Sequence, residues 1–297
     1  ITTAGNISSE FLNEPLAEVM METLTHVFCG FCQQDTCGGG ENITKDLVRS
    51  RSVYALAKHL LNTGKVDEAI GLLFESIELD DRNIDAHYLL GYVYDEKKGE
   101  KERAEKYFRK VISINPDHSK ALYKLGFLAN ENGDQNKSMI YLERAIELDP
   151  HEPEAWVCLG VVYKELGEDD RAIATYMKGL ELDPRCETAH YNLGNVYHDI
   201  NDSQRAVENY EKALEIKPSH ADAWYNLGAV HQASGNYERS LECYKKTLEL
   251  QPSSEDARES VRALENYLLE KLRSKKESSK EGKKKGRGSF LARKKRK

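Results

Sequence analysis

The chain has 297 residues, 39% hydrophobic and 31% charged, with a mean hydropathy of −0.67. This composition is typical of a soluble, helix-rich chain, and no apolar run approaches the roughly 18 residues that a transmembrane helix requires. The net charge of −7 hides an asymmetry, because residues 271–297 hold fourteen Lys and Arg against two Glu. That tail carries +12, which leaves −19 for residues 1–270. An acidic body joined to a basic tail bears on partners and not on fold.

Residues 1–49 are predicted to hold an N-terminal helix and a linker rich in Cys and Gly. Apolar side chains recur at helical spacing over about residues 9–28, and Pro15 suits a first turn. They are Phe11, Leu12, Leu16, Val19, Met20 and Leu24. This amphipathic helix is expected to cap the repeats that follow.

The linker contains four soft or borderline metal ligands within twelve residues. They are His26, Cys29, Cys32 and Cys37. Such a set could close a tetrahedral zinc site, which is the one cofactor that the sequence suggests. The second Cys-x2-Cys of a zinc finger is missing, and Cys-Gly-Phe-Cys also has the form of a redox motif, without its strand-to-helix setting. Ordinary thiols in a chain that needs no cofactor are the competing interpretation.

The centre of the chain repeats with a period of 34 residues. Five prolines and four glycines recur at this spacing. They are Pro116, Pro150, Pro184, Pro218 and Pro252, and Gly126, Gly160, Gly194 and Gly228. A Leu precedes each of these glycines. Further along each repeat, a small residue is followed four positions later by a Leu or a Tyr. These pairs are Ser138 and Leu142, Ala172 and Tyr176, Ala206 and Tyr210, and Ser240 and Tyr244.

These residues resemble the tetratricopeptide repeat family, whose Trp-x2-Leu-Gly-x2-Tyr, Ala, Phe and Pro pattern has the same period. The resemblance implies six helix-turn-helix repeats, at 50–83, 84–118, 119–152, 153–186, 187–220 and 221–254. The second has one extra residue, expected in the turn around Gly99. The first departs most, with Ala57 at the Gly position and Asp81 at the Pro position.

A single helix pair cannot bury both of its faces, so neighbouring pairs must stack into a one-dimensional core. The predicted fold is all-α: a right-handed superhelical α-solenoid of six repeats with N- and C-terminal capping helices. After an N-cap at Ser253 or Ser254, the C-terminal cap is expected over 255–278, and a disordered basic tail over 279–297. The apolar stripe of this cap is Ala257, Val261, Leu264, Leu268 and Leu272.

The first helix of each repeat offers a second face, one residue beyond its buried bulky position. In this family that phase lines the inner, concave groove, although partly buried packing is an equal alternative here. The residues are Tyr54, Tyr88, Tyr123, Val157, Tyr191 and Tyr225. Tyrosine rings with a free hydroxyl make good binding surface at modest entropic cost.

Acidic residues further along the same helices are expected to give the groove a negative lining, unless they form only a solvated face. They are Asp95, Glu96, Glu131, Glu165 and Asp199. The favoured partner is therefore a protein peptide that carries basic and apolar residues. A co-chaperone clamp would need a basic groove, and Lys58, Lys120 and Arg51 do not complete one.

Asn192 and Asn226 share one phase directly before Leu-Gly, and Asn195 lies one turn further. This arrangement resembles the repeat region of the O-linked N-acetylglucosamine transferases, where such asparagines hold a peptide backbone. A carboxamide offers both a donor and an acceptor for this purpose. No glycosyltransferase domain follows, so the resemblance implies a binding region.

No nucleophile–base arrangement, phosphate loop or His-Glu-x2-His motif appears, so the chain is predicted to be a non-enzymatic scaffold or adaptor within a larger complex. The alternatives are a metal or redox role of the cysteines, and a nuclear or nucleic-acid-associated factor tethered by its basic tail. Cysteines without a pairing pattern favour the cytoplasm or nucleus. Self-association through the end helices stays open.

Overall fold

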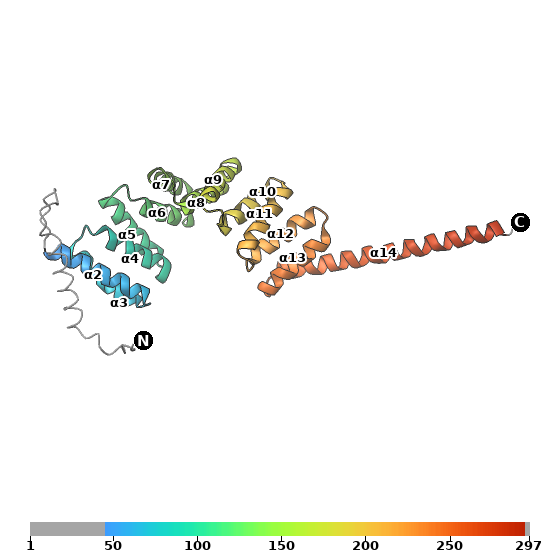
Figure 1. The fold of residues 1–297 in the computed structure, drawn as a ribbon, viewed down its shortest axis with the longest axis horizontal. Helices are drawn as coiled ribbons and strands as arrows, with labels where there is room; N and C mark the ends of the chain where they lie inside the picture. The colour runs from blue at the N-terminus through green and yellow to red at the C-terminus, as the bar shows by residue number, and fades with distance from the viewer. Residues whose placement is uncertain (1–44, 295–297) are drawn as a thin grey trace, which may run out of the picture. The chain divides into compact units, whose positions relative to one another are not determined.

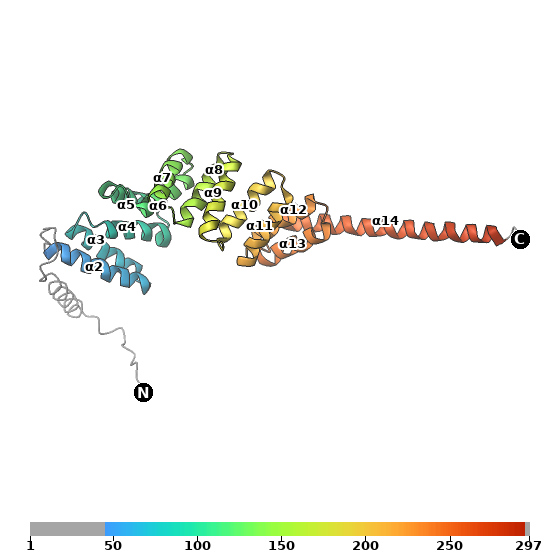
Figure 2. The same cartoon turned by 45° about the horizontal axis from the view of Figure 1, so that its top comes forward.

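The computed structural model describes the backbone of residues 45–294 and the side chains of residues 45–274. The chain divides into two units, residues 1–149 and residues 150–297. All regular structure in the described residues is helical, and consecutive helices pack as pairs within each unit (Figures 1 and 2). This confirms the predicted all-α fold of solenoid repeats.

The first unit contains three helix pairs: α2 (Lys45–Asn62) with α3 (Val66–Leu79), α4 (Ile84–Val93) and η1 (Tyr94–Lys98) with α5 (Lys101–Ile114), and α6 (Ser119–Glu131) with α7 (Gln135–Leu148). The second contains three pairs and a long last helix: α8 (Pro153–Glu165) with α9 (Asp169–Leu182), α10 (Glu187–Asp199) with α11 (Ser203–Ile216), α12 (Ala221–Ala233) with α13 (Tyr237–Leu250), and α14 (Glu255–Lys294).

In five of the six described pairs, a ring or Leu of the second helix packs directly on the repeat glycine of the first helix. The first pair has Ala57 at this position. A Cβ atom on Gly194 would lie 2.6 Å from the ring of Tyr210, and one on Gly160 would lie 2.6 Å from the ring of Tyr176. Tyr176 and Tyr210 are fully buried there. Glycine at this position is therefore required because the two helices approach too closely for any side chain.

Each first helix ends in the same left-handed turn. In five of the six described pairs, the residue after the turn donates its N–H to a carbonyl five residues back, as Asp202 does to Tyr197 at 2.8 Å, which is the Schellman pattern. A glycine has the positive φ in five pairs, and Asn201 takes that place in α10, with a φ of 62°. Asn is the residue that tolerates this region best after Gly.

The extra residue of the second repeat lies where the sequence predicts it, immediately before Gly99. Here the chain makes one π-helical turn, η1, and Glu100 donates its N–H to Tyr94, six residues back, at 2.8 Å. The corresponding bond in the next pair, from Asp134 to Ala129, spans five residues. The π turn therefore absorbs the insertion, and the 34-residue period resumes in α5.

A long donor side chain near the start of most first helices bonds the carbonyl six residues earlier. Trp156 and Trp224 donate their indole N–H to Pro150 O at 3.0 Å and Pro218 O at 2.9 Å. In the capping helix, Arg258 donates to Pro252 O at 2.7 Å. This bond satisfies a carbonyl that the preceding loop leaves without a helical partner.

The last helix begins as predicted, because Ser254 Oγ accepts the N–H of Ala257 at 3.3 Å. Ala257 and Leu264 are buried against the last pair, whereas Leu272, expected in the same stripe, is 56% exposed. The cap therefore packs over its first turns only, since α13 is too short to cover the rest.

Two boundaries differ from the sequence prediction. Residues 45–49, assigned to the linker, belong to α2, and residues 279–294, expected to be disordered, continue α14 as helix. The second segment is rich in Lys, Arg and Glu, which are good helix formers, although Gly282, Gly286 and Gly288 lower its helix propensity. The predicted N-terminal helix, residues 9–28, lies outside the described residues.

Candidate functional site

The predicted groove tyrosines all lie on the first helices and are all half-buried. They are Tyr54 on α2, Tyr88 on α4, Tyr123 on α6, Tyr191 on α10 and Tyr225 on α12, whereas Val157 on α8 is buried. Each tyrosine is partly buried and keeps part of its surface in solvent, and its role in binding stays a prediction.

In the first unit, Tyr88 packs between two elements. Its ring centroid lies 5.6 Å from that of Phe108 in the paired helix and 5.2 Å from that of His118, which precedes the next first helix. Burial, with a smaller contribution from the charge of Asp85, raises the pKa of Tyr54. These tyrosines therefore bridge neighbouring helix pairs as well as forming surface.

Lys124 on α6 organises the acidic residues of the first unit. Its Nζ lies 3.0 Å from Asp95 Oδ2 and 2.7 Å from Glu96 Oε1, and Lys101 pairs with Glu131. Burial lowers the pKa of Lys124, but its hydrogen bonds to the two carboxylates outweigh that effect and raise it. The Lys124 hydrogen bond lowers the pKa of Glu96.

In the second unit, a hydrogen-bonded network joins the predicted asparagines to the tyrosines. Asn195 Oδ1 accepts from Tyr210 Oη at 2.7 Å and from Asn226 Nδ2 at 3.0 Å. Asn226 Nδ2 also lies 3.3 Å from Tyr191 Oη. Burial raises the pKa of Tyr210, which keeps its hydroxyl protonated as the donor. The network connects α10 to α12.

Two further ring contacts involve the predicted tyrosines of the second unit. The ring of Tyr191 lies 4.5 Å from that of His220, and the ring of Tyr225 lies 5.2 Å from that of Tyr244. Asn192 is half-buried, and Glu165 is exposed.

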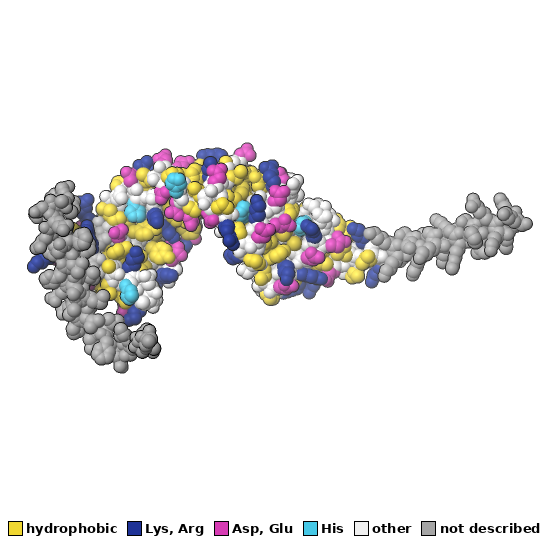
Figure 3. All heavy atoms as spheres, in the orientation of Figure 1, with side chains coloured by type: hydrophobic (Ala, Val, Ile, Leu, Met, Phe, Trp, Pro, Cys, Tyr) yellow, Lys and Arg dark blue, Asp and Glu magenta, His cyan; other side chains and the backbone are white. Residues whose placement is uncertain are grey.

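Lysine side chains balance most of the predicted acidic lining. Asp199 Oδ2 lies 2.7 Å from Lys164 Nζ, which also contacts Asp169 at 3.0 Å. The carboxylates of Asp95, Glu96 and Glu131 pair with Lys124 and Lys101 in the first unit. Figure 3 accordingly shows acidic and basic side chains interspersed on the visible face of each unit. A continuous negative lining is not present in the described residues.

Sequence reasoning missed the lysines as part of the site. Lys124 occupies the phase of Asn192 and Asn226, directly before Leu-Gly, so the 34-residue period already places it beside them. The signal was therefore present in the sequence. The position directly before Leu-Gly in one repeat, here Lys124, pairs with the acidic positions of the preceding repeat, here Asp95 and Glu96.

The predicted zinc ligands, His26, Cys29, Cys32 and Cys37, lie outside the described residues. Within residues 45–274, no cluster of His, Cys, Asp and Glu could hold a metal ion. Burial raises the pKa of the Cys243 thiol to about 11. Among the helices that the structure describes, none is long and apolar enough to cross a membrane.

Family comparisons identify the repeats. Residues 53–182 match the middle TPR-like domain of cilia and flagella-associated protein 70. Residues 195–235 match a TPR repeat model, and residues 221–254 match the tetratricopeptide repeat model. No match is found among curated protein sequences.

Solved structures agree. The chain is 28% identical to MamA, with a TM-score of 0.50 over 55% of this chain and 95% of MamA. It is 26% identical to YrrB, described as a TPR protein with an unusual peptide-binding site, with a TM-score of 0.50 over 59% of this chain and 89% of YrrB. PilW, a type IV pilus biogenesis factor, shares the fold at 20% identity, with a TM-score of 0.62 over 72% of this chain and 97% of PilW. With the observed helix pairs, these matches show that residues 195–254 contain tetratricopeptide repeats and that residues 53–182 form a TPR-like domain.

Proposed function

We propose that this protein is an interaction scaffold that binds an extended peptide segment of a partner protein on the tyrosine-bearing face of the first helices within a unit. The observation that carries the proposal is the row of half-exposed tyrosines, joined in the second unit by the amides of Asn195 and Asn226. Aromatic rings supply contact area, and amides can exchange their mutual bonds for bonds to a peptide backbone. Similarity to YrrB, a protein described by its peptide-binding site, supports the same use.

The ion pairs change the expected chemistry of the ligand. A basic peptide must compete with Lys124 and Lys164 for their carboxylates, which costs part of the electrostatic gain. Apolar and aromatic contacts with the tyrosines are therefore proposed to dominate affinity. Basic residues in the peptide then contribute mainly to the rate of association, since long-range attraction to a body of net charge −19 remains.

The test uses peptides selected from a random display library on the full chain. Affinity for the selected peptides should fall at least tenfold in the Tyr88→Ala, Tyr123→Ala, Tyr191→Ala variant, measured by calorimetry at a temperature where circular dichroism shows it folded. Ile140, on α7 and 63% exposed, provides the matched control, because Ile140→Ala removes apolar surface from a second helix. Equal affinity of the tyrosine variant and the wild type would exclude this face as the binding surface.

The match of residues 53–182 to a cilia and flagella-associated domain favours a more specific second proposal, a scaffold role in a cilium or flagellum. Such a role accords with membership of a larger complex. A fluorescent fusion of the full chain, expressed in a ciliated cell, should concentrate along the cilium. A diffuse signal indistinguishable from that of the free fluorescent protein would reject the ciliary role and leave the peptide proposal intact.

A further inference from the structure

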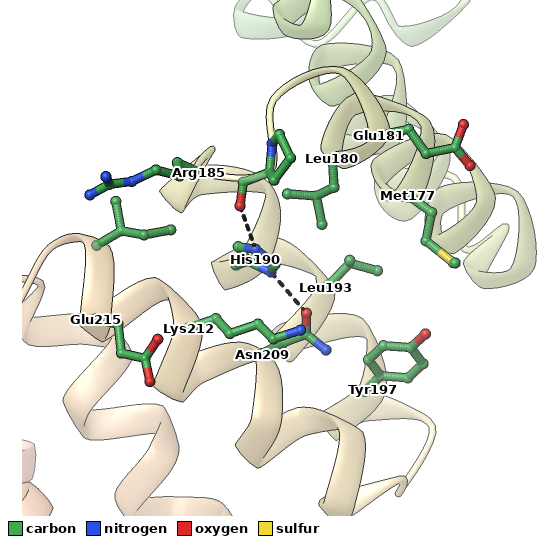
Figure 4. A pocket seen from close by; sticks show the side chains of 12 residues that line it. Met177, Leu180, Glu181, Arg185, His190, Leu193, Tyr197, Asn209, Lys212 and Glu215 are labelled. Carbon is green, nitrogen blue, oxygen red and sulfur yellow. Dashed lines mark hydrogen bonds between the residues drawn. The ribbon is translucent and has the colours of Figure 1, made fainter.

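The second unit contains an open pocket of about 650 Å³ between α9, α10 and α11. Figure 4 shows its side chains converging from these three helices and from the loop that carries Arg185. Its floor is apolar, built by Leu180, Leu193 and Ile216 around the imidazole of His190. None of the groove residues proposed above lines it, so it is a separate surface.

His190 stands where the neighbouring repeats have tryptophan, since Trp156 and Trp224 lie 34 residues to either side. His190 makes the same bond to the preceding loop, with Nε2 3.3 Å from Pro184 O. Its Nδ1 lies 3.1 Å from Asn209 Oδ1. An imidazole is smaller than an indole, however, so His190 covers less of the apolar floor.

The rim of the pocket also differs in sequence from the neighbouring repeats. Met177 is 51% exposed on α9, and the corresponding positions one repeat away are Glu143 and Glu211. An exposed thioether in a charged position is adaptable contact surface, with a preference for aromatic rings. Two independent departures, His190 and Met177, therefore border the same opening.

We propose that this pocket receives the side chain of a tryptophan presented by a partner protein. The indole would lie beside the imidazole of His190, in the space that a tryptophan at position 190 would cover and the smaller ring leaves open. Leu180 and Leu193 would contact its faces, and Met177 would close over its edge. The backbone that flanks the tryptophan would lie in the remainder of the opening, between Glu181 and Lys212. Aromatic anchors in such pockets dominate the energetics of many interfaces.

The test is a titration of the full chain with N-acetyl-tryptophanamide, followed by methyl and amide chemical shifts. The wild type should show saturable millimolar binding that shifts the signals of Met177, Leu180 and Leu193. Met177→Glu, which restores the charge of the adjacent repeats, should weaken binding at least fivefold without unfolding the chain. His190→Trp should abolish binding and raise the melting temperature.

The matched control is Leu166→Glu, which alters an exposed apolar residue that does not line the pocket and should leave binding unchanged. If His190→Trp destabilises the chain, His190→Trp with Asn209→Cys reproduces the pair found in the next repeat, Trp224 and Cys243. Unchanged affinity in Met177→Glu or in the folded tryptophan variant would overturn the proposal. Equal affinity for N-acetyl-leucinamide, or no saturable binding by the wild type, would overturn it as well.

Discussion

The left-handed turns allow glycine's conformational role to be separated from its lack of a side chain. Gly167 has a φ of +76°, whereas Gly71 lies inside α3, and a Cβ at either position would meet nothing within 4 Å. Gly167→Ala should therefore lower the free energy of unfolding by about 1 kcal/mol through backbone strain alone. Gly71→Ala should raise it by about 0.5 to 1 kcal/mol, because Ala is the better helix former. Urea denaturation of both variants measures the two values, and shifts of equal sign would contradict this account.

At the same scale, the sequence predicted residue positions better than residue roles. The tyrosine phase was placed correctly on the first helices, but Tyr88 and Tyr191 also stack on histidines that precede the next pair. Those contacts depend on how adjacent repeats are rotated, and a single-repeat pattern does not contain that information. For the same reason, His190 could not be distinguished from an ordinary replacement of tryptophan.

Among the elements, η1 and α6 are coupled by a nearly buried ion pair. The side chain of Asp95 is 4% exposed and that of Lys124 is 12% exposed. Lys124→Met should lower the free energy of unfolding by about 3 kcal/mol, since it leaves a buried carboxylate with only the more distant Lys101. Lys178→Met, in an exposed pair with Glu181, should change it by less than about 0.5 kcal/mol. Chemical denaturation at pH 7 compares the two, and similar losses would show that burial does not matter here.

This coupling should also depend on pH. The pKa of Glu96 is held below its ordinary value of 4.5 in the folded state, mainly by the hydrogen bond from Lys124. The stability gained from a depressed pKa is present above the unfolded value and is lost as pH falls through the folded value. The difference in melting temperature between wild type and Lys124→Met should therefore shrink as pH falls below 4.5. If the difference in melting temperature grew as the pH fell, the lowered pKa of Glu96 would not be the source of this stability.

Helix limits were predictable where a cap residue and an apolar stripe coincide, as at Ser254. They were not predictable where helix propensity acts without burial. Residues 279–294 contain no apolar stripe, which is why a disordered tail was expected, yet their Lys, Arg and Glu content is compatible with helix. The start of α2 was missed because residues 45–49 carry no repeat signature.

For the whole molecule, stability should follow the nearest-neighbour logic of repeat proteins. Leu269 and Leu272 are 52% and 56% exposed, so α14 packs little on its neighbours at these positions. Deletion of residues 275–297 should leave the melting temperature within about 2 °C of wild type, whereas deletion of residues 255–297 should lower it by several degrees, because it uncovers α13. Scanning calorimetry of both truncations provides the measurement. Equal loss in the two would show that the distal part of α14 has a structural role.

The single π turn at residues 94–98 has a practical consequence for this architecture. The π turn accommodates the added residue locally, and α5 regains the common 34-residue spacing. A change in the length of this turn therefore does not shift the repeat positions that follow it. A short epitope or a segment that carries a fluorophore, inserted at Gly99, should therefore leave the later helices unchanged. This turn would then be a suitable attachment point for a label that reports on bound partners.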